Sequence, residues 1–167
     1  MPEDEFKQQV DSFLEGSSFD AAVGVELAVE LEKKSMNFYR QQKGAAADSA
    51  LKKLFEFLIS QEEAHFKIVV GLRQKLRQEK GWVDLSEEQL ALSKAAGGGI
   101  FSKDYPFPKI SDKSKREALL YAVEWEKEAK KFYDFMKENT TEPDAKSLFS
   151  ELAEFEEGHI KLLESVL

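Results

Sequence analysis

Two short patterns contain every histidine of this 167-residue chain. His65 follows Glu62 by three positions, and His159 follows Glu156 by three positions. On an α-helix this spacing places the carboxylate and the imidazole on one face, one turn apart. Two such pairs, with one glutamate from each of two further helices, form the ligand set with which a four-helix bundle holds two metal ions.

The two further glutamates are present, and an internal repeat relates the two halves of the chain. Glu32 precedes Glu62 by 30 residues (62 − 32), and Glu126 precedes Glu156 by the same interval (156 − 126). One offset of 94 residues (126 − 32) superposes the two sets. The flanking sequence repeats with this offset, as in Ala28-Val29-Glu30 with Ala122-Val123-Glu124 and Phe38-Tyr39 with Phe132-Tyr133. We therefore expect a duplicated helix pair, each half supplying half of one site; the copy number is too low for a solenoid.

Helical phase distinguishes these glutamates from the many other acidic residues. At about 100° per residue, Glu32 shares an apolar stripe with Val29, while Glu30 faces elsewhere. Equivalent stripes carry the other candidates, namely Glu62, His65, Glu126, Glu156 and His159. Four buried carboxylates repel one another and are costly to bury in ionised form. Two divalent cations would remove that cost; the ligand set suits two ions of iron or manganese, with zinc as a further alternative.

Two tyrosines lie on the same stripes. Tyr39 comes seven residues after Glu32 (39 − 32), and Tyr133 comes seven residues after Glu126 (133 − 126). One interpretation is that both are core aromatics whose hydroxyls need partners. The other is that each hydroxyl holds a ligand carboxylate from the opposite half and so supports catalysis. The two interpretations are compatible, and both remain open from the residues alone.

The pattern of helix signals predicts an all-α chain forming one domain over 1–167. A short leading helix is expected over 3–15, and the four long helices form two pairs, 19–80 and 111–167, each joined by a short loop. The connection over 81–110 contains Gly97-Gly98-Gly99, Pro106 and Pro108. Short first and last loops require antiparallel neighbours, whereas a long middle crossover makes the second and third long helices parallel, as in ferritin-like bundles.

Composition excludes several other classes. A net charge of −8 and a pI near 5.0 argue against nucleic-acid binding, which needs a basic face. The absence of cysteine excludes disulfides, thiolate metal sites and a cysteine-ligated electron-transfer centre in this chain. No apolar run approaches the roughly 20 residues that span a bilayer, and the acidic start is unlike a secretory signal. We therefore expect a soluble cytoplasmic protein with no membrane partner.

At this point the motifs resemble a known family. The patterns Glu32-x6-Tyr39, Glu62-x2-His65, Glu126-x6-Tyr133 and Glu156-x2-His159 look like the rubrerythrin branch of the ferritin-like di-iron proteins, over about residues 19–80 and 111–167. The resemblance implies a non-haem di-iron site in a four-helix bundle. It also implies the roles of the six side chains: terminal carboxylates Glu32 and Glu126, bridging carboxylates Glu62 and Glu156, and terminal nitrogen ligands His65 and His159.

Two departures modify what the resemblance implies. Full-length rubrerythrins carry a cysteine-bound, rubredoxin-like iron centre, so here electrons would come from an external donor such as a rubredoxin-like protein. Rubrerythrins also have a further glutamate one turn after the third-helix ligand, where this chain has Ala129, and Glu128 points off the stripe. The site is therefore more symmetric, as in bacterioferritin-like centres.

The leading functional hypothesis is a di-iron oxidoreductase that reduces hydrogen peroxide or dioxygen, either as a peroxidase or as a ferroxidase. The family resemblance also implies a homodimer. A second hypothesis is a non-catalytic metal-binding or iron-handling protein. A manganese catalase-like activity is a third, and it would release oxygen from peroxide without any reductant.

Overall fold

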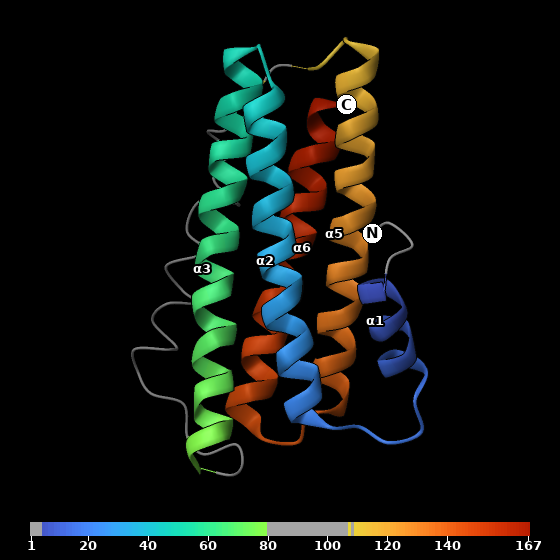
Figure 1. Cartoon of the computed structure of the whole chain (residues 1–167), viewed down its shortest axis with the longest axis vertical. Helices are drawn as coiled ribbons and strands as arrows, with labels where there is room; N and C mark the ends of the chain where they lie inside the picture. The colour runs from blue at the N-terminus through green and yellow to red at the C-terminus, as the bar shows by residue number, and fades with distance from the viewer. Residues whose placement is uncertain (1–4, 80–106, 108) are drawn as a thin grey trace.

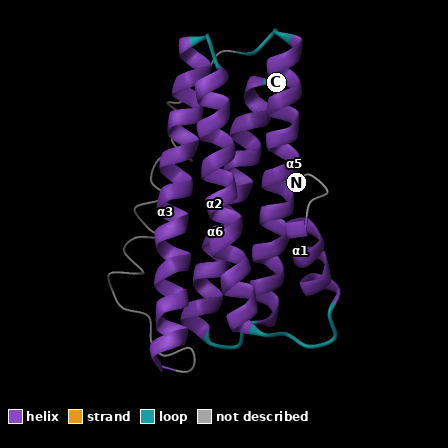
Figure 2. Ribbon diagram, viewed as in Figure 1, coloured by secondary structure: helices purple, strands orange, loops and turns teal. Residues whose placement is uncertain are grey.

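A computed structural model describes residues 5–79, 107 and 109–167, and this part of the chain is helical, with no strand (Figure 2). The five helices are α1 Glu5–Glu15, α2 Ala21–Ala45, α3 Ser49–Glu79, α5 Lys113–Asn139 and α6 Pro143–Val166. The predicted all-α class and the four long helices are confirmed. Most of the expected crossover, 81–106 and 108, lies outside the described residues. Among the described helices, none combines the length and apolar character that crossing a lipid bilayer requires.

Side-chain caps define where the long helices begin. Asp20 Oδ1 accepts hydrogen bonds from the backbone N–H groups of Ala22 and Val23, at 2.9 and 3.3 Å. Asp48, Asp112 and Glu142 cap the other three long helices in the same way. Each cap satisfies N–H groups that have no partner within the helix. Asp20 is therefore the N-cap of α2, and α6 begins with Pro143 directly after its cap.

The four long helices form two antiparallel pairs (Figure 1). α2 packs along α3, α5 packs along α6, and contacts of α2 with α5 and of α3 with α6 join the pairs. The colour gradient shows that α3 and α5 run in the same direction, whereas α2 and α6 run in the opposite one. This arrangement needs a connection from one end of the bundle to the other between α3 and α5, as the length of the middle segment predicts. The short helix α1 lies against α5.

Two apolar clusters fill the bundle on either side of its middle. The first cluster contains residues from the start of α2 and the end of α3, among them Val25, Ala28, Val69, Leu72, Phe132 and Phe149. The second contains residues from the other end, among them Leu51, Leu54, Leu58, Leu119, Ala122 and Leu163. Along every long helix the candidate ligands come between the residues of these clusters. A polar layer therefore crosses the core, with apolar packing above and below it.

Candidate metal centre

All six candidate ligands lie in this buried layer, contributed by all four long helices. Glu32 comes from α2, the pair Glu62 and His65 from α3, Glu126 from α5, and the pair Glu156 and His159 from α6. None of these side chains is more than 1% exposed to solvent. Buried ionisable groups are rare unless they are paired or bind a metal ion. Four carboxylates and two imidazoles in one layer therefore need a specific explanation.

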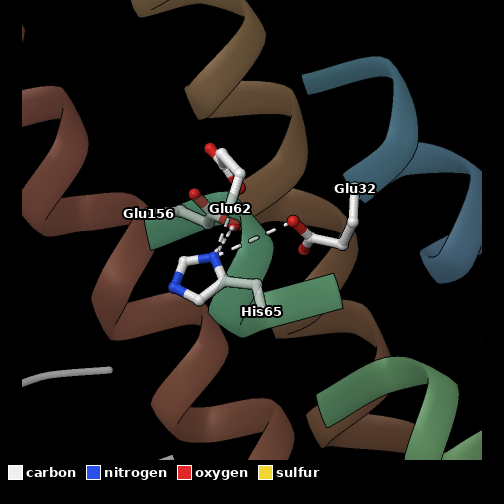
Figure 3. A group of neighbouring side chains, drawn as sticks. All are labelled: Glu32, Glu62, His65 and Glu156. Carbon is white, nitrogen blue, oxygen red and sulfur yellow. Dashed lines mark ion pairs between the residues drawn. The ribbon is translucent and has the colours of Figure 1, made fainter. Parts of the chain in front are cut away.

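The first group surrounds the Nδ1 atom of His65 (Figure 3). This nitrogen lies 3.3 Å from Glu62 Oε2, 3.5 Å from Glu156 Oε1 and 3.8 Å from Glu32 Oε2. In Figure 3 the three carboxylates, from three different helices, converge on the nitrogen. The imidazole ring stacks on Phe155 with a centroid separation of 5.1 Å, which fixes the plane of the ring.

The second group surrounds the Nδ1 atom of His159. This nitrogen lies 3.0 Å from Glu156 Oε2, 3.4 Å from Glu62 Oε1 and 3.5 Å from Glu126 Oε2. The two imidazole rings lie 5.3 Å apart between centroids, with their planes at 22°. The second group therefore has the same make-up as the first, with Glu126 in the place of Glu32.

The two groups overlap through a pair of shared carboxylates. One consists of Glu32, Glu62, His65 and Glu156, and the other of Glu62, Glu126, Glu156 and His159; within each, one donor atom per residue lies within 4.8 Å of all the others. Both groups can hold a metal ion, and Glu62 and Glu156 belong to both. In this arrangement each shared carboxylate can bind two neighbouring ions, one through each of its oxygens.

Several of the converging atoms have no hydrogen-bond partner among the described residues. They include Glu32 Oε2, both carboxylate oxygens of Glu62, Glu126 Oε2 and Nδ1 of His65. A buried polar atom without a partner costs free energy, so it needs a compensating interaction. Nitrogen and oxygen donors of this kind are what a divalent metal ion uses. The residues present therefore fit a bound metal pair.

Each tyrosine hydroxyl donates a hydrogen bond across the bundle to a ligand carboxylate of the other half. Tyr39 donates to Glu126 Oε1, and Tyr133 donates to Glu32 Oε1. Both tyrosines are fully buried, and both also belong to the apolar clusters. The two interpretations of these residues thus hold together: they are core aromatics, and their hydroxyls hold the outer carboxylates in place. The free oxygen of each carboxylate is left pointing into its group.

The carboxyl groups divide into two pairs by their pKa values. Burial raises the pKa of Glu32 and of Glu126 well above its usual range, and the charges of Glu62 and Glu156 raise both further. Burial also acts to raise the pKa of Glu62 and of Glu156, but the adjacent imidazoles of His65 and His159 outweigh it and lower both. The two shared carboxylates are thus the more acidic pair, and the two outer ones are the more basic pair.

Burial and the neighbouring carboxylates also shift the pKa values of the imidazoles and the phenols. Burial acts to lower the pKa of His65 and of His159, but the surrounding carboxylates raise both, and they raise His159 further. Burial and the nearby carboxylates together raise the pKa of Tyr39 and of Tyr133 well above that of a free phenol. The carboxylates therefore favour protonation of the imidazoles, and a metal that binds their nitrogens would compete with those protons.

The acidic residues that flank the candidates point away from the layer, as the helical phase predicts. Glu63 forms an ion pair of 2.8 Å with Arg40, and Glu157 forms one of 3.5 Å with Lys161. Both glutamate side chains are 40% or more exposed. Ala129 is buried, and Glu128 is only partly buried. Each Glu-Glu dipeptide therefore contributes its first carboxylate to the core and its second to the surface.

One buried contact beside the site is not apparent from the sequence patterns. The indole N–H of Trp125, which precedes Glu126, donates a 2.6 Å hydrogen bond to Ser35 Oγ. Both residues are buried, so Trp125 is a core residue rather than an exposed one. The repeat offset puts Leu31 and Ala129 in the equivalent places, and these two cannot form the bond. Comparison of the two halves could have indicated this contact, because position 125 of the second half offers a donor and position 35 of the first half offers an acceptor, whereas the equivalent positions offer neither.

Comparison of the chain with protein-family models, with curated proteins and with solved structures finds no match in any of the three. The geometry and chemistry of the site itself are therefore what point to a function.

Proposed function

We propose that this chain is a ferritin-like, rubrerythrin-like di-iron oxidoreductase, which reduces hydrogen peroxide or dioxygen with electrons from an external donor. One observation carries the proposal: two buried groups of one histidine and three glutamates overlap through Glu62 and Glu156. Such a set from four helices is the ligand arrangement of di-iron and di-manganese carboxylate bundles. The parallel course of α3 and α5 also supports the ferritin-like arrangement.

The residues divide naturally between two metal positions. Glu32 and His65 would hold one ion, Glu126 and His159 would hold the other, and Glu62 and Glu156 would bridge them. Bound iron(II) supplies electrons to an O–O bond and acts as a Lewis acid toward its oxygen atoms. Carboxylate and imidazole donors together are typical of non-haem iron, and we take iron as the resident ion in this proposal. Manganese is the alternative that the same donors would accept.

The remaining residues prepare this position for a small oxidant. The hydroxyls of Tyr39 and Tyr133 orient the outer carboxylates, so each presents one oxygen to its ion. The apolar clusters on both sides restrict water, which strengthens electrostatic interactions within the layer. The buried phenols and imidazoles also keep protons close to where reduced oxygen would need them. Each of these contributions comes from this chain alone.

The proposal includes partners that the site itself requires. The chain contains no cysteine, so it has no thiolate electron-transfer centre, and the electrons must come from a separate donor such as a rubredoxin-like protein. We place the protein in the cytoplasm, as a homodimer, in keeping with the resemblance. Hydrogen peroxide is the preferred oxidant in this proposal, and ferroxidase turnover with dioxygen is a close variant.

Metal content is the decisive first measurement. Anaerobic iron(II) loading followed by elemental mass spectrometry should give about two irons per wild-type chain, the number that this ligand set holds. The double variant Glu62→Ala/Glu156→Ala should lose that iron, because both metal positions share these carboxylates. Glu63→Ala/Glu157→Ala is the matched control, since it removes the neighbouring surface carboxylates and should keep wild-type iron. Peroxide consumption with a reductant is then assayed on the loaded protein.

The outcomes separate the proposal from its competitors. Absence of stoichiometric metal from the wild type would sink the enzyme proposal. A stable zinc or iron content without peroxide turnover would favour a non-catalytic metal-binding or iron-handling protein instead. The burial of all six side chains favours that second function, because an ion held there is screened from reactants. Oxygen release from peroxide without a reductant would indicate the manganese catalase-like chemistry.

A further inference from the structure

A path of three aromatic rings leads from the candidate metal centre to the surface. Tyr39 is fully buried and donates its hydrogen bond to Glu126. Its ring centroid lies 5.3 Å from that of Phe38, and the Phe38 centroid lies 5.1 Å from that of Tyr121. Phe38 and Tyr121 are both partly exposed. One end of the path thus touches a ligand carboxylate, and the other end reaches solvent between α2 and α5.

Among the described residues, the other half of the repeat has no counterpart to this path. Tyr133 packs against Phe132 and Phe149, at centroid separations of 5.5 and 6.4 Å. Phe132 in turn contacts Phe13 at 6.0 Å. The repeat offset places Leu27 where Tyr121 stands (121 − 94). Among the described residues, the rings that continue outward from Tyr133 are therefore phenylalanines, which are much harder to oxidise than a phenol.

We propose that Tyr39, Phe38 and Tyr121 form a one-electron path that connects the metal centre to reductants at the surface. The inference rests on the proposed function. The path would operate when hydrogen peroxide reacts at a site that holds a single iron(II). Reduction of peroxide to water takes two electrons, and one iron(II) supplies only one of them. A hydroxyl radical would be released unless a second electron came from the protein.

Tyr39 is placed to supply that second electron. The balanced step takes one hydrogen peroxide, one iron(II), one tyrosine, the Glu126 carboxylate and two protons from solvent to two waters, one iron(III), one neutral tyrosyl radical and one protonated Glu126. The O–O bond breaks, and Tyr39 loses its electron to the peroxide oxygen and its phenolic proton to Glu126, the acceptor of its hydrogen bond. Tyr121 then gives one electron to Tyr39 across Phe38, and Tyr39 recovers its proton from Glu126. Tyr121 releases its own proton to solvent, because it is partly exposed.

The path moves the oxidised position from the core to a place where it can be repaired. A radical left on Tyr39 would sit among buried side chains, out of reach of any soluble reductant. On Tyr121 the same radical meets solvent, and a small one-electron reductant of the enediol or phenol class can restore the tyrosine. The metal position nearest the path would thus tolerate incomplete loading with iron.

Rapid-freeze electron paramagnetic resonance on the full chain tests this inference. The protein is loaded anaerobically with a single equivalent of iron(II), mixed with hydrogen peroxide, and then mixed with ascorbate after a delay. Wild type should show a tyrosyl signal, narrowed by ring-deuterated tyrosine, that ascorbate removes quickly. Tyr121→Phe should leave a tyrosyl signal that ascorbate removes several-fold more slowly. Tyr121→Trp should restore fast removal, because an indole can also be oxidised there.

A matched pair of phenylalanine-to-leucine variants tests the path without altering Tyr39 or Tyr121. Phe38→Leu should slow removal by ascorbate, whereas Phe132→Leu, its repeat equivalent, should leave it at the wild-type rate. A spin trap should detect more hydroxyl radical in Tyr39→Phe than in wild type. Iron content is measured for every variant, so loss of metal is told apart from loss of the path.

Three results would overturn the inference. The first is an equal rate of removal by ascorbate in wild type and in Tyr121→Phe. The second is a signal with the character of a tryptophan radical, which would assign the electron to a tryptophan instead of Tyr39. The third is the absence of any protein radical from protein that binds about two irons and turns over peroxide, which would leave the proposed function standing. Absence of iron binding would overturn the proposed function and this inference together.

Discussion

The tyrosine hydroxyls do more for the site than fill space. Each of them satisfies one oxygen of an outer carboxylate and leaves the other oxygen without a hydrogen-bond partner. Groups that orient metal ligands influence affinity although they do not touch the metal. The two hydroxyls therefore have an effect that can be measured separately from the ligands.

The first prediction concerns these hydroxyls. Tyr39→Phe/Tyr133→Phe should weaken metal binding by about 10–100-fold, the usual effect of removing a partner that orients a ligand. The expected reason is that Glu126 and Glu32 lose the donor that fixes their rotation. Competition titration with a chelating dye measures the affinity. Phe38→Leu, which alters packing beside Tyr39 but keeps both hydroxyls, should bind metal as wild type does; equal weakening in that variant would contradict the explanation.

A second prediction concerns the buried bond between Trp125 and Ser35. Ser35→Ala leaves the indole N–H without its acceptor, and an unsatisfied buried donor costs about 1–3 kcal/mol of unfolding free energy. Urea denaturation of the metal-free protein measures the loss. Ser60→Ala is the control, because the exposed Ser60 hydroxyl donates to the carbonyl of Phe57 in its own helix. That control should change stability by less than about 0.5 kcal/mol; a similar loss in both variants would refute the role of the buried bond.

At the scale of the residue, sequence reasoning located the candidate site because its signals are local. The spacing of Glu62 and His65 on a helix defines a shared face without any knowledge of neighbouring helices. The bond from Trp125 to Ser35 was missed because it joins two helices, and its formation depends on how α2 and α5 rotate against each other. For the tyrosines, the residues left two interpretations open, and the hydrogen bonds of Tyr39 and Tyr133 agree with the one that involves a ligand carboxylate of the opposite half.

Helix ends follow from short-range chemistry, so the elements were predicted closely. Asp20 offers an acceptor to backbone N–H groups two and three residues ahead, and this requires nothing from the rest of the fold. The helix pairs begin and end one or two residues from the predicted bounds 19–80 and 111–167, since the end turns of a helix depend on local fraying. The crossover was predicted only as a connection, because Gly and Pro mark where helices stop and not what replaces them.

The third prediction concerns one of these caps. Asp20→Ala should lower the unfolding free energy by about 0.5–2 kcal/mol, because the first N–H groups of α2 lose their acceptor. Asp20→Asn is the matched variant, since asparagine caps helices about as well as aspartate does. Thermal or urea unfolding followed by circular dichroism measures both. A loss of the same size in the asparagine variant would show that charge, rather than the hydrogen bond, is what matters at this position.

Over the whole molecule, burial of the polar layer costs free energy, and a bound metal pair would offset that cost and stabilise the fold. Two apolar clusters hold the bundle together from both sides, yet between them lie six buried ionisable groups. Without metal, protons must compensate the carboxylates, and the cost depends on pH. With metal, the carboxylates are compensated directly, and binding to the folded state adds to stability. The stability of the whole fold should therefore report on the state of the site.

The fourth prediction gives the direction of that dependence for the metal-free protein. His65 and His159 have raised pKa values, so their stabilisation is complete below the ordinary pKa of 6.5 and is lost as pH rises through the raised values. Glu32 and Glu126 also have raised pKa values, so their stabilisation is complete below the ordinary pKa of 4.5 and is lost as pH rises through the raised values. Glu62 and Glu156 act oppositely, since their lowered pKa values provide stability above 4.5 that is lost in stronger acid.

Together these contributions predict that the metal-free protein is most stable near pH 4.5 and becomes less stable toward neutral pH. Differential scanning calorimetry between about pH 5 and about pH 8 should show a falling melting temperature for the metal-free protein. Protein loaded with redox-inert zinc should show a gain over the metal-free form that grows with pH, because metal displaces protons. Glu32→Gln/Glu126→Gln removes two of the titrating groups and should flatten the metal-free curve at its acidic end. A wild-type curve that rises toward neutral pH would mean that the layer does not hold its protons, and that the surface charges rather than the site control the stability of the bundle.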